Sequence, residues 1–296
     1  MSIEIKKLEH TYNENTPFSH AALKGIDLSI PEGKVTAIIG QTGSGKSTLV
    51  QHLNGLLIPT AGTLDICGFH IQPLLKIKDV KQLRKEVGLV FQFPEYQLFE
   101  ETIGKDIAFG PKNFGTSEED ASQLVKKVLP VVGLDESYLD RSPFDLSGGQ
   151  KRRVAIAGVL AMNPDFLVLD EPTAGLDPKG RDEILDQLVL LHKTRGISVV
   201  LVSHSMEDIA KYVERIIVMN HGHVAFDDTP KKVFAHYKEL EKIGLAAPQM
   251  TYIMHALKEH GMDVDVTATT VEEARDTILA ALESQKKNGK KGAEVC

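Results

Sequence analysis

The sequence has little cysteine, no long hydrophobic run and no excess of positive charge. Its two cysteines, Cys67 and Cys296, lie far apart without metal-ligand spacing, which fits a protein kept in a reduced cytosol. The apolar runs are short, and none approaches the roughly 20 residues of a membrane-spanning helix. They cover residues 35–39, 166–169, 197–202 and 216–219. We therefore expect a chain that does not cross a membrane by itself.

Charge and chain length narrow the possible classes further. The formal net charge of −7 gives no electrostatic indication of nucleic-acid binding, so no nucleic-acid partner is expected, although the composition leaves room for a local basic patch. The N-terminus has no apolar run after its charges, unlike a secretory signal. The 296 residues, 42% of them hydrophobic, suffice for one large domain with an appendage or for two modest domains.

Segments typical of strands and of helices alternate along the chain. Each short apolar run is bounded by turn residues and indicates a buried strand, whereas residues 123–132 and 181–193 have helical spacing. This alternation predicts an α/β fold with a mostly parallel sheet. Ahead of it, residues 3–8 and 22–30 are expected to form short antiparallel strands around a loop at residues 13–20.

Two other parts of the chain are expected to be mainly helical. Over about residues 95–161, Gly and Pro punctuate helical segments, which we interpret as a helical subdomain inserted into a domain of residues 1–235. A helical C-terminal extension is expected over residues 236–296. The helices expected after Pro230 cover residues 233–243, 248–260 and 270–285. The tail from about Lys286 is rich in Lys and Gly, and we expect it to be disordered.

The clearest motif is a complete phosphate-binding loop between the strand at residues 35–39 and a helical run. It consists, with the residue after it, of Gly40, Gln41, Thr42, Gly43, Ser44, Gly45, Lys46, Ser47 and Thr48. Glycines let backbone N–H groups face phosphate oxygens, and the helix start adds its positive dipole end. Lys46 would bring charge to the outer phosphates, and the Ser47 hydroxyl would ligate Mg²⁺. ATP and Mg²⁺ are the expected cofactors, and a glycine-rich turn that binds nothing is the alternative.

A second motif is the apolar strand at residues 166–169, which ends in Asp170 and Glu171. Asp170 is expected to hold Mg²⁺, and Glu171, one residue further along, would polarise the attacking water. Two solvated acids at a strand end are the ordinary alternative. The phosphate-binding loop in the same chain favours the hydrolytic role.

A third motif is a serine with two glycines directly before the helical run at residues 151–160. It reads Leu146, Ser147, Gly148, Gly149 and Gln150. Such a helix start binds anions. Because one ATP needs only one such loop, we interpret Ser147 to Gln150 as contacts to an ATP held by another subunit. A simple capped turn is the alternative.

In this order the motifs resemble those of the ATPase subunits of ATP-binding cassette transporters, over roughly residues 1–235. The resemblance implies a P-loop NTPase (RecA-like) core with an N-terminal antiparallel β-subdomain, and it implies ATP hydrolysis. Gln92 matches the family's Q-loop glutamine, a catalytic and Mg²⁺ contact, and His204 matches its switch histidine. Tyr12 resembles the aromatic residue that stacks on adenine, and residues 174–177 resemble the D-loop.

Several local stretches are similar to the ATPases of energy-coupling factor transporters in particular. They are residues 16–18 (Thr-Pro-Phe), 53–56, 91–99 and 151–158. This resemblance implies a second cassette ATPase, either a paralogue or a second copy, a membrane coupling subunit and a substrate-capturing membrane subunit. Such systems import vitamins and some metal ions. The chain would be peripheral, at the cytoplasmic face of the cell membrane, and residues 16–18 resemble the second ATPase of the pair more than the first.

Other interpretations stay open from the sequence. The chain could serve a conventional binding-protein-dependent importer, or it could be a soluble cassette protein, although those usually carry two cassettes or a long coiled-coil insertion. The large apolar side chains around Gln92 predict either core packing or a groove for a helix of a membrane partner. They are Phe91, Phe93, Tyr96, Leu98 and Phe99.

Two further features also have alternative interpretations. The extension has an apolar stripe at Tyr252, Ile253, Ala256, Leu257, Ala274, Ile278 and Leu279, which would pack either on its own cassette or on the other ATPase. His221 and His223 could suggest a metal site, but we interpret them as part of a solvated turn because they gather too few ligands.

Overall fold

The computed structural model describes residues 2–74 and 77–293. The chain forms two compact units: one comprises Met1–His204 and Ile217–Ala225, and the other comprises Ser205–Ile216 and Phe226–Cys296. The second unit therefore includes residues ahead of the expected boundary at residue 236. These residues pack with the helices that follow them, which helical spacing alone could not indicate.

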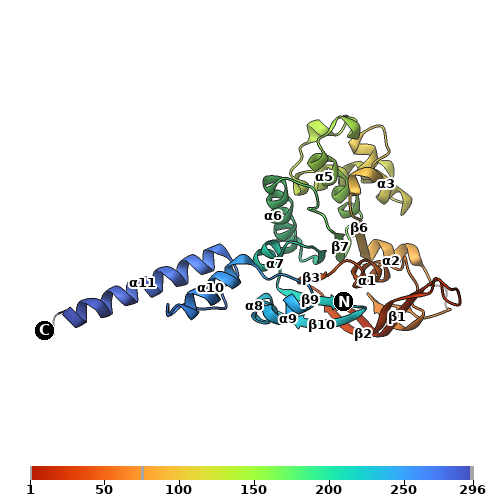
Figure 1. Cartoon of the computed structure of the whole chain (residues 1–296). Coiled ribbons are helices and arrows are strands. Elements are labelled where there is room, and N and C mark those ends of the chain that lie inside the picture. Colours follow the sequence, from red (N-terminus) through yellow and green to blue (C-terminus); the bar gives the residue numbers. More distant parts are fainter. Residues whose placement is uncertain (1, 75–76, 294–296) are drawn as a thin grey trace. The chain divides into compact units, whose positions relative to one another are not determined.

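A six-stranded sheet has the order β10-β9-β3-β8-β7-β6 (Figure 1), and all of it belongs to the first unit except residues 215–216 of β9 and 226–228 of β10. Its strands are β3 (Val35–Gly40), β6 (Val87–Val90), β7 (Phe166–Asp170), β8 (Ser198–Val202), β9 (Arg215–Asn220) and β10 (His223–Asp228). The strands β3, β8, β7 and β6 pair in parallel, which confirms the predicted mostly parallel sheet. Their continuous apolar runs are buried, as in strands of a parallel sheet that is covered on both faces.

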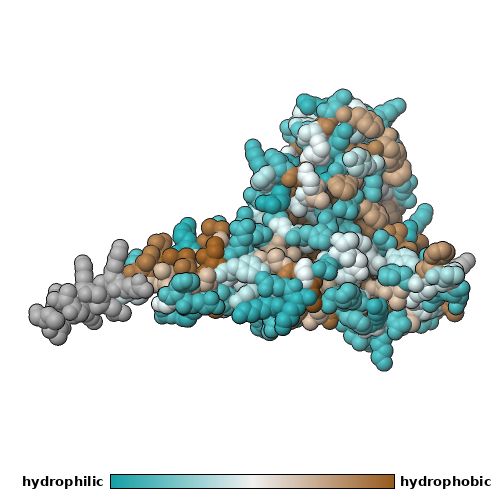
Figure 2. Space-filling model, in the orientation of Figure 1, coloured by the Kyte–Doolittle hydropathy of each residue, from teal (hydrophilic) through white to brown (hydrophobic). Residues whose placement is uncertain are grey.

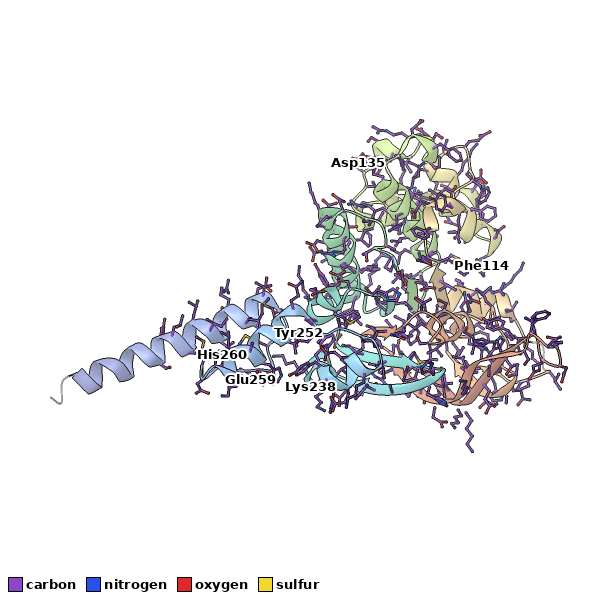
Figure 3. All side chains as sticks on the ribbon, viewed as in Figure 1. Phe114, Asp135, Lys238, Tyr252, Glu259 and His260 are labelled. Carbon is purple, nitrogen blue, oxygen red and sulfur yellow. The ribbon has the colours of Figure 1, made fainter. Side chains whose placement is uncertain are left out.

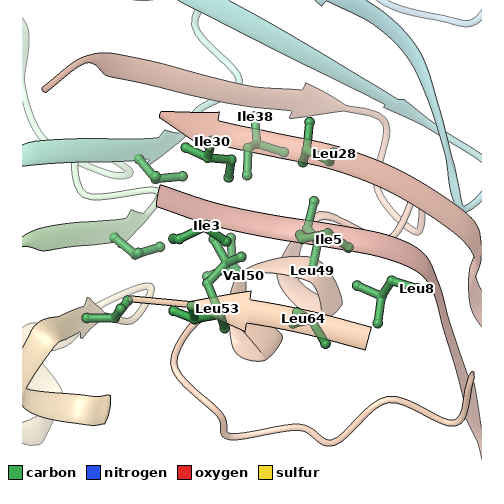
Figure 4. Packing of buried hydrophobic residues seen from close by; sticks show 14 of the residues in the cluster. Ile3, Ile5, Leu8, Leu28, Ile30, Ile38, Leu49, Val50, Leu53 and Leu64 are labelled. Atoms are coloured by element: carbon green, nitrogen blue, oxygen red, sulfur yellow. The ribbon is translucent and has the colours of Figure 1, made fainter. Parts of the chain in front are cut away.

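A second, antiparallel sheet has the order β2-β1-β4-β5. Its strands are β1 (Ser2–Tyr12), β2 (His20–Pro31), β4 (Ala61–Ile66) and β5 (Phe69–Ile71). The two predicted N-terminal strands are confirmed, and β4 and β5 add to them. Apolar side chains of this sheet pack with helix α1 (Lys46–Leu53) and with Ile38 of β3 in the core shown in Figure 4. This core holds α1, and hence the loop before it, against both sheets.

Helices fill the region where we expected an inserted helical subdomain (Figure 1). They are α3 (Ile103–Asn113), α4 (Glu118–Val128) and α5 (Gly148–Leu160), with 3₁₀ turns η1 (Pro94–Gln97), η2 (Pro130–Val132), η3 (Glu136–Tyr138) and η4 (Pro143–Asp145). Helix α2 (Val80–Glu86) precedes β6. The helix predicted at residues 123–132 is wrong at its end: α4 stops at Val128 because Pro130 cannot donate a backbone hydrogen bond. The helix predicted at residues 181–193 is confirmed within α6 (Pro178–Arg195).

The second unit contains α7 (Met206–Tyr212), α8 (Pro230–Ala235), α9 (Tyr237–Lys242), α10 (Gln249–Glu259) and α11 (Val271–Ala293). The single helix predicted at residues 233–243 is wrong: it is broken at His236, whose ψ of 32° leaves the helical region. Helix α11 continues to Ala293 in place of the disorder expected from Lys286, since lysine favours helix and lengthening a helix costs far less than starting one. Residues 294–296 lie outside the described residues. Within the described ranges, no helix is long and apolar enough to cross a membrane.

Candidate functional site

Within the phosphate-binding loop, residues 41–45 form the segment that joins β3 to α1. Gly40 and Gly45, at its two ends, have positive φ values of 154° and 103°. A Cβ on Gly40 would lie 2.3 Å from the Met219 carbonyl oxygen, and one on Gly45 would lie 2.7 Å from the Ala22 carbonyl oxygen. Only glycine fits at these positions, because the loop passes directly over the backbone of the neighbouring strands.

Lys46 begins α1 and lies folded over the loop. Its side chain is buried, and its Nζ donates to the carbonyl oxygens of Gly40 (2.7 Å) and Gln41 (2.9 Å). Burial lowers the pKa of Lys46, whereas the nearby carboxylates of Glu171 and Asp170 raise it. The ammonium group is therefore held at the loop, where it can meet the outer phosphates of a nucleotide.

Asp170 ends β7 next to this lysine. Burial raises the pKa of its carboxyl group, and the hydrogen bond from Ser47 is the strongest opposing effect. Ser47 and Gln92 both line a cavity in front of the phosphate-binding loop. The hydroxyl, carboxylate and amide oxygens of these three residues are of the chemical kind that a hard cation such as Mg²⁺ prefers. In the described residues no cluster of three or more His, Cys, Asp or Glu side chains offers a metal site elsewhere, and His221 and His223 are exposed at the β9–β10 turn.

Glu171 and His204 face each other across the ends of two adjacent parallel strands. The His204 Nε2 lies 2.7 Å from the Glu171 Oε1. Glu171 has a φ of 51°, in the left-handed region, and its N–H donates to the Val202 carbonyl oxygen at 3.0 Å. This turn directs the Glu171 side chain away from the strand direction and toward the segment that follows β8.

A cavity of about 430 Å³ lies in front of the loop and unites most of the predicted site residues. Those that line it are Tyr12, Thr42, Gly43, Gly45, Lys46, Ser47, Thr48, Gln92, Glu171 and His204. Gly40, Gln41, Ser44 and Asp170 do not line it; the first three belong to the frame of the loop, and Asp170 contacts Ser47. His20 also lines the cavity and was not predicted. Its signal is strand register, since His20 lies directly opposite Tyr12 in the β1–β2 pair.

The serine-glycine motif caps α5. The Ser147 side chain accepts the Gln150 N–H at 3.3 Å, and the Gln150 Oε1 accepts the Ser147 N–H at 3.0 Å. The Gln150 amide also donates to the Tyr138 hydroxyl at 3.1 Å. This reciprocal capping box fixes the start of the helix, while Ser147 and Gly148 stay exposed.

Comparison with known proteins agrees with this geometry. The sequence profile of the ABC transporter family matches residues 23–174. The energy-coupling factor transporter ATP-binding protein EcfA2 of Clostridium perfringens is 55% identical, over 94% of this chain and 98% of that protein. The EcfA2 protein of Clostridium tetani is 53% identical, over 97% of this chain and 100% of its own length.

Solved structures of similar proteins agree with these sequence comparisons. CbiO1 from Clostridium perfringens, described as part of the ABC transporter complex CbiONQ, superposes with a TM-score of 0.72 and 38% identity, over 86% of this chain and 98% of its own. The ATP-binding cassette MJ0796, bound to ADP and phosphate as a dimer, gives a TM-score of 0.68 and 31% identity, over 77% and 98%. The chain therefore belongs to the ABC transporter ATPases and, within them, to the energy-coupling factor transporter ATP-binding proteins.

Proposed function

We propose that this chain hydrolyses ATP as a peripheral subunit, at the cytoplasmic face of the cell membrane, of an importer for vitamins or other micronutrients. The observation that carries the proposal is the convergence of Lys46, Gln92, Glu171 and His204 on one cavity. The 55% identity to a protein named as an energy-coupling factor ATPase favours this importer class over a conventional one.

The residues of the chain supply the parts for transfer of a phosphoryl group to water. Lys46 and the loop N–H groups bind and orient the phosphates. Glu171 accepts a proton from water as the water oxygen attacks the terminal phosphorus, and the bond to the leaving ADP oxygen breaks. The contact from His204 holds the Glu171 carboxylate in place. Ser47, Asp170 and Gln92 would hold Mg²⁺, which neutralises phosphate charge when bound.

A second cassette ATPase, a paralogue or a second copy, completes the site in this proposal. Among the described residues that line the cavity, none comes from the motif at residues 147–150. That motif presents an exposed, capped helix start, with its first N–H groups free of intrahelical partners. These features favour contact between Ser147, Gly148 and Gly149 and the phosphates of an ATP bound to the other ATPase.

Aromatic residues beside Gln92 are the proposed contact to the membrane coupling subunit. Phe93, Tyr96 and Phe99 are 41%, 84% and 57% exposed, whereas Leu98 is buried and Phe91 packs against the core. The exposure of these three large aromatic side chains in one short segment supports a docking surface. The burial of Leu98 and the packing of Phe91 instead support core packing for those two residues. Substrate capture would belong to a further membrane subunit.

The extension is the proposed contact between the two ATPases. Part of its apolar stripe packs within the second unit, where Ala274 is buried and Leu257 and Ile278 border the same cluster. Tyr252, labelled in Figure 3, accepts the Ala247 N–H at 3.1 Å. Apolar side chains nevertheless stay exposed, and Figure 2 shows them gathered along α11. On α11 they are Val271 (63%), Leu279 (52%) and Leu282 (39%), and on α10 Ile253 (43%) is also exposed.

Affinity purification of the full chain from solubilised membranes tests the proposed assembly. We expect a related ATPase and at least one membrane protein to co-purify, and their masses identify the complex. Recovery of the chain without any membrane protein contradicts the importer role. A form truncated after Tyr237 tests the extension separately, because its nucleotide-free ATPase pair should dissociate on size exclusion. An intact pair contradicts the role of the extension alone.

A further inference from the structure

Tyr12 takes part in a closed ring of contacts between β1 and α1. Its hydroxyl lies 3.2 Å from the Thr48 Oγ1, one residue after Ser47 of the phosphate-binding loop. Tyr12 is 36% exposed and lines the cavity in front of the phosphate-binding loop. One hydrogen bond at the hydroxyl does not fix the plane of a tyrosine ring, because the ring can still rotate about its long axis. Other contacts must therefore set that plane.

His10 supplies the first of these contacts. Side chains two positions apart on a strand share a face, and the His10 ring lies edge-on to Tyr12 with centroids 4.6 Å apart and planes at 78°. His10 is buried, and its Nδ1 lies 3.2 Å from the Ile58 carbonyl oxygen. Because a carbonyl oxygen only accepts hydrogen bonds, the Nδ1 must donate, which fixes the orientation of the imidazole.

His52 supplies the second contact from the far side. Its ring is fully buried and lies edge-on to His10, with centroids 4.8 Å apart and planes at 76°. Its Nδ1 lies 2.7 Å from the carbonyl oxygen of Thr48, one turn earlier in α1. The contacts thus return to their starting residue: Thr48 to His52 to His10 to Tyr12, and from the Tyr12 hydroxyl back to Thr48.

Both imidazoles are suited to packing rather than to carrying charge. Burial lowers the pKa of His52 to about 4, and burial also lowers the pKa of His10, against the opposing effect of Ile58 and Glu14. Neutral rings placed edge-on to one another and to a tyrosine gain from the attraction between ring edge and ring face. Each is anchored by a backbone hydrogen bond that a leucine or phenylalanine could not make.

We propose that His10 and His52 are positioning residues for the nucleotide base, which hold the ring plane of Tyr12 relative to the phosphate-binding loop. This inference rests on the proposed role of Tyr12 as the adenine contact. It goes further, since it connects the base contact to the phosphate contact through two residues that line no part of the cavity. Through this closed set of contacts, α1 would align both the base and the phosphates of the nucleotide.

The test compares two ligands on the full-length chain: Mg-ATP, and Mg-tripolyphosphate, which has phosphates but no base. For His10→Ala and His52→Ala we expect the affinity for ATP, measured by calorimetry, to fall about 3- to 10-fold, the range of one or two aromatic contacts. Affinity for tripolyphosphate should not change. His10→Phe keeps a ring edge but loses the hydrogen bond to Ile58, so it should recover only part of the loss.

Two comparisons separate positioning from loss of stability. His192→Ala removes a half-buried histidine whose Nδ1, like those of His10 and His52, lies close to a backbone carbonyl oxygen, here that of Ile197 at 2.8 Å. It should lower the melting temperature without changing the ratio of the two affinities. Tyr12→Phe keeps the ring, loses the bond to Thr48, and should reduce ATP affinity alone by about 2- to 5-fold. This variant keeps the test decisive should His10→Ala fail to fold.

The outcomes distinguish the inference from the function on which it rests. A wild-type ratio of affinities in His10→Ala or Tyr12→Phe, together with a reduced ratio in Tyr12→Ala, overturns the positioning role only. A wild-type ratio in Tyr12→Ala overturns the adenine contact, and the positioning role with it. Equal losses for ATP and tripolyphosphate in His10→Ala also overturn the inference, because they indicate general damage to the phosphate-binding loop.

Discussion

Arg152 and Glu95 form a buried, two-point ion pair between the helix α5 and the turn η1. The Arg152 Nη2 lies 2.7 Å from the Glu95 Oε1, and its Nε lies 3.0 Å from the Oε2. The side chain of Arg152 is 2% exposed and that of Glu95 is 14% exposed. The Nη1 also donates to the carbonyl oxygens of Pro172 and Ala174, directly after Glu171. One guanidinium thus joins the segment after Gln92, the helix α5 and the segment after Glu171, the proposed base.

Removing Glu95 should destabilise the chain strongly. Glu95→Ala leaves the Arg152 guanidinium buried without its counter-charge, which costs about 3–5 kcal/mol. We expect Glu95→Gln to lose less, because an amide oxygen still accepts one hydrogen bond. Urea unfolding measures both. The matched control is Glu101→Ala, which breaks the exposed Glu101–Lys105 pair and should leave stability unchanged. Equal stability of Glu95→Ala and wild type would show that solvent or another acid replaces the carboxylate.

Glu171→Gln tests the proposed base. The substitution keeps the shape of the side chain but removes its proton acceptor, so the rate of hydrolysis should fall roughly 10²- to 10⁴-fold. Binding of ATP should persist, because Lys46 and the loop are untouched, and the variant should accumulate as an ATP-bound pair. Single-turnover hydrolysis and size exclusion measure the two effects. Glu183→Gln, outside the cavity, is the control. Hydrolysis by Glu171→Gln at the wild-type rate rules Glu171 out as the base.

The dependence of stability on pH should report His52. Its pKa of about 4 in the folded chain lies below the value of about 6.5 expected when it is unfolded. Between these values the unfolded state binds the extra proton, so stability should fall as the pH drops from about 6.5 to 4, by up to about 3 kcal/mol. Burial of His10 adds in the same direction.

Urea unfolding at pH 7 and pH 4.5 measures this effect. His52→Gln removes the titrating group, so the stability of this variant should change less between pH 7 and pH 4.5 than that of wild type. The variant should nevertheless be less stable than wild type at pH 7. His221→Gln changes an exposed histidine and should keep the wild-type slope. If the slope of His52→Gln equals that of wild type, His52 is already protonated in the folded chain, or other groups dominate.

Local motifs could be predicted from the sequence because the residues that form each motif are adjacent in the chain. The phosphate-binding loop needs only glycines at the right spacing between a strand and a helix, and Asp170 and Glu171 lie at the end of a short apolar run that is itself visible in the sequence. The parallel sheet follows from the alternation of the same apolar runs with helical segments.

Contacts between distant residues could not be predicted in the same way. His10 and His52, or Glu95 and Arg152, meet only because of strand register and helix packing, and neither pair has a spacing that signals contact. The broken helix at His236 is a further example, since its residues favour helix and the break comes from the surrounding structure. Composition near Lys286 suggested disorder, but an existing helix extends through it.

Variants of the exposed aromatic residues beside Gln92 should distinguish a transporter subunit from a soluble ATPase. Buried aromatic anchors commonly contribute about 2 kcal/mol or more each when truncated at an interface. Tyr96→Ala and Phe99→Ala should therefore weaken assembly with the membrane coupling subunit or uncouple hydrolysis from uptake. Because Tyr96 is 84% exposed in the chain alone, its loss should leave melting temperature and ATP affinity unchanged.

Phe99→Ala should affect the isolated chain as well as the complex. Its ring packs edge-on against Phe109, with centroids 4.8 Å apart, so Phe99→Ala should lower the melting temperature slightly as well as the yield of complex. Phe18→Ala, which removes an aromatic residue about as exposed as Tyr96 (81% against 84%) from the loop between β1 and β2, should change neither the melting temperature nor the yield of complex. Core packing makes a different prediction for Tyr96→Ala: the isolated chain would melt early, in proportion to its lost assembly. That result would assign these aromatic residues to stability, and the coupling surface would have to lie elsewhere.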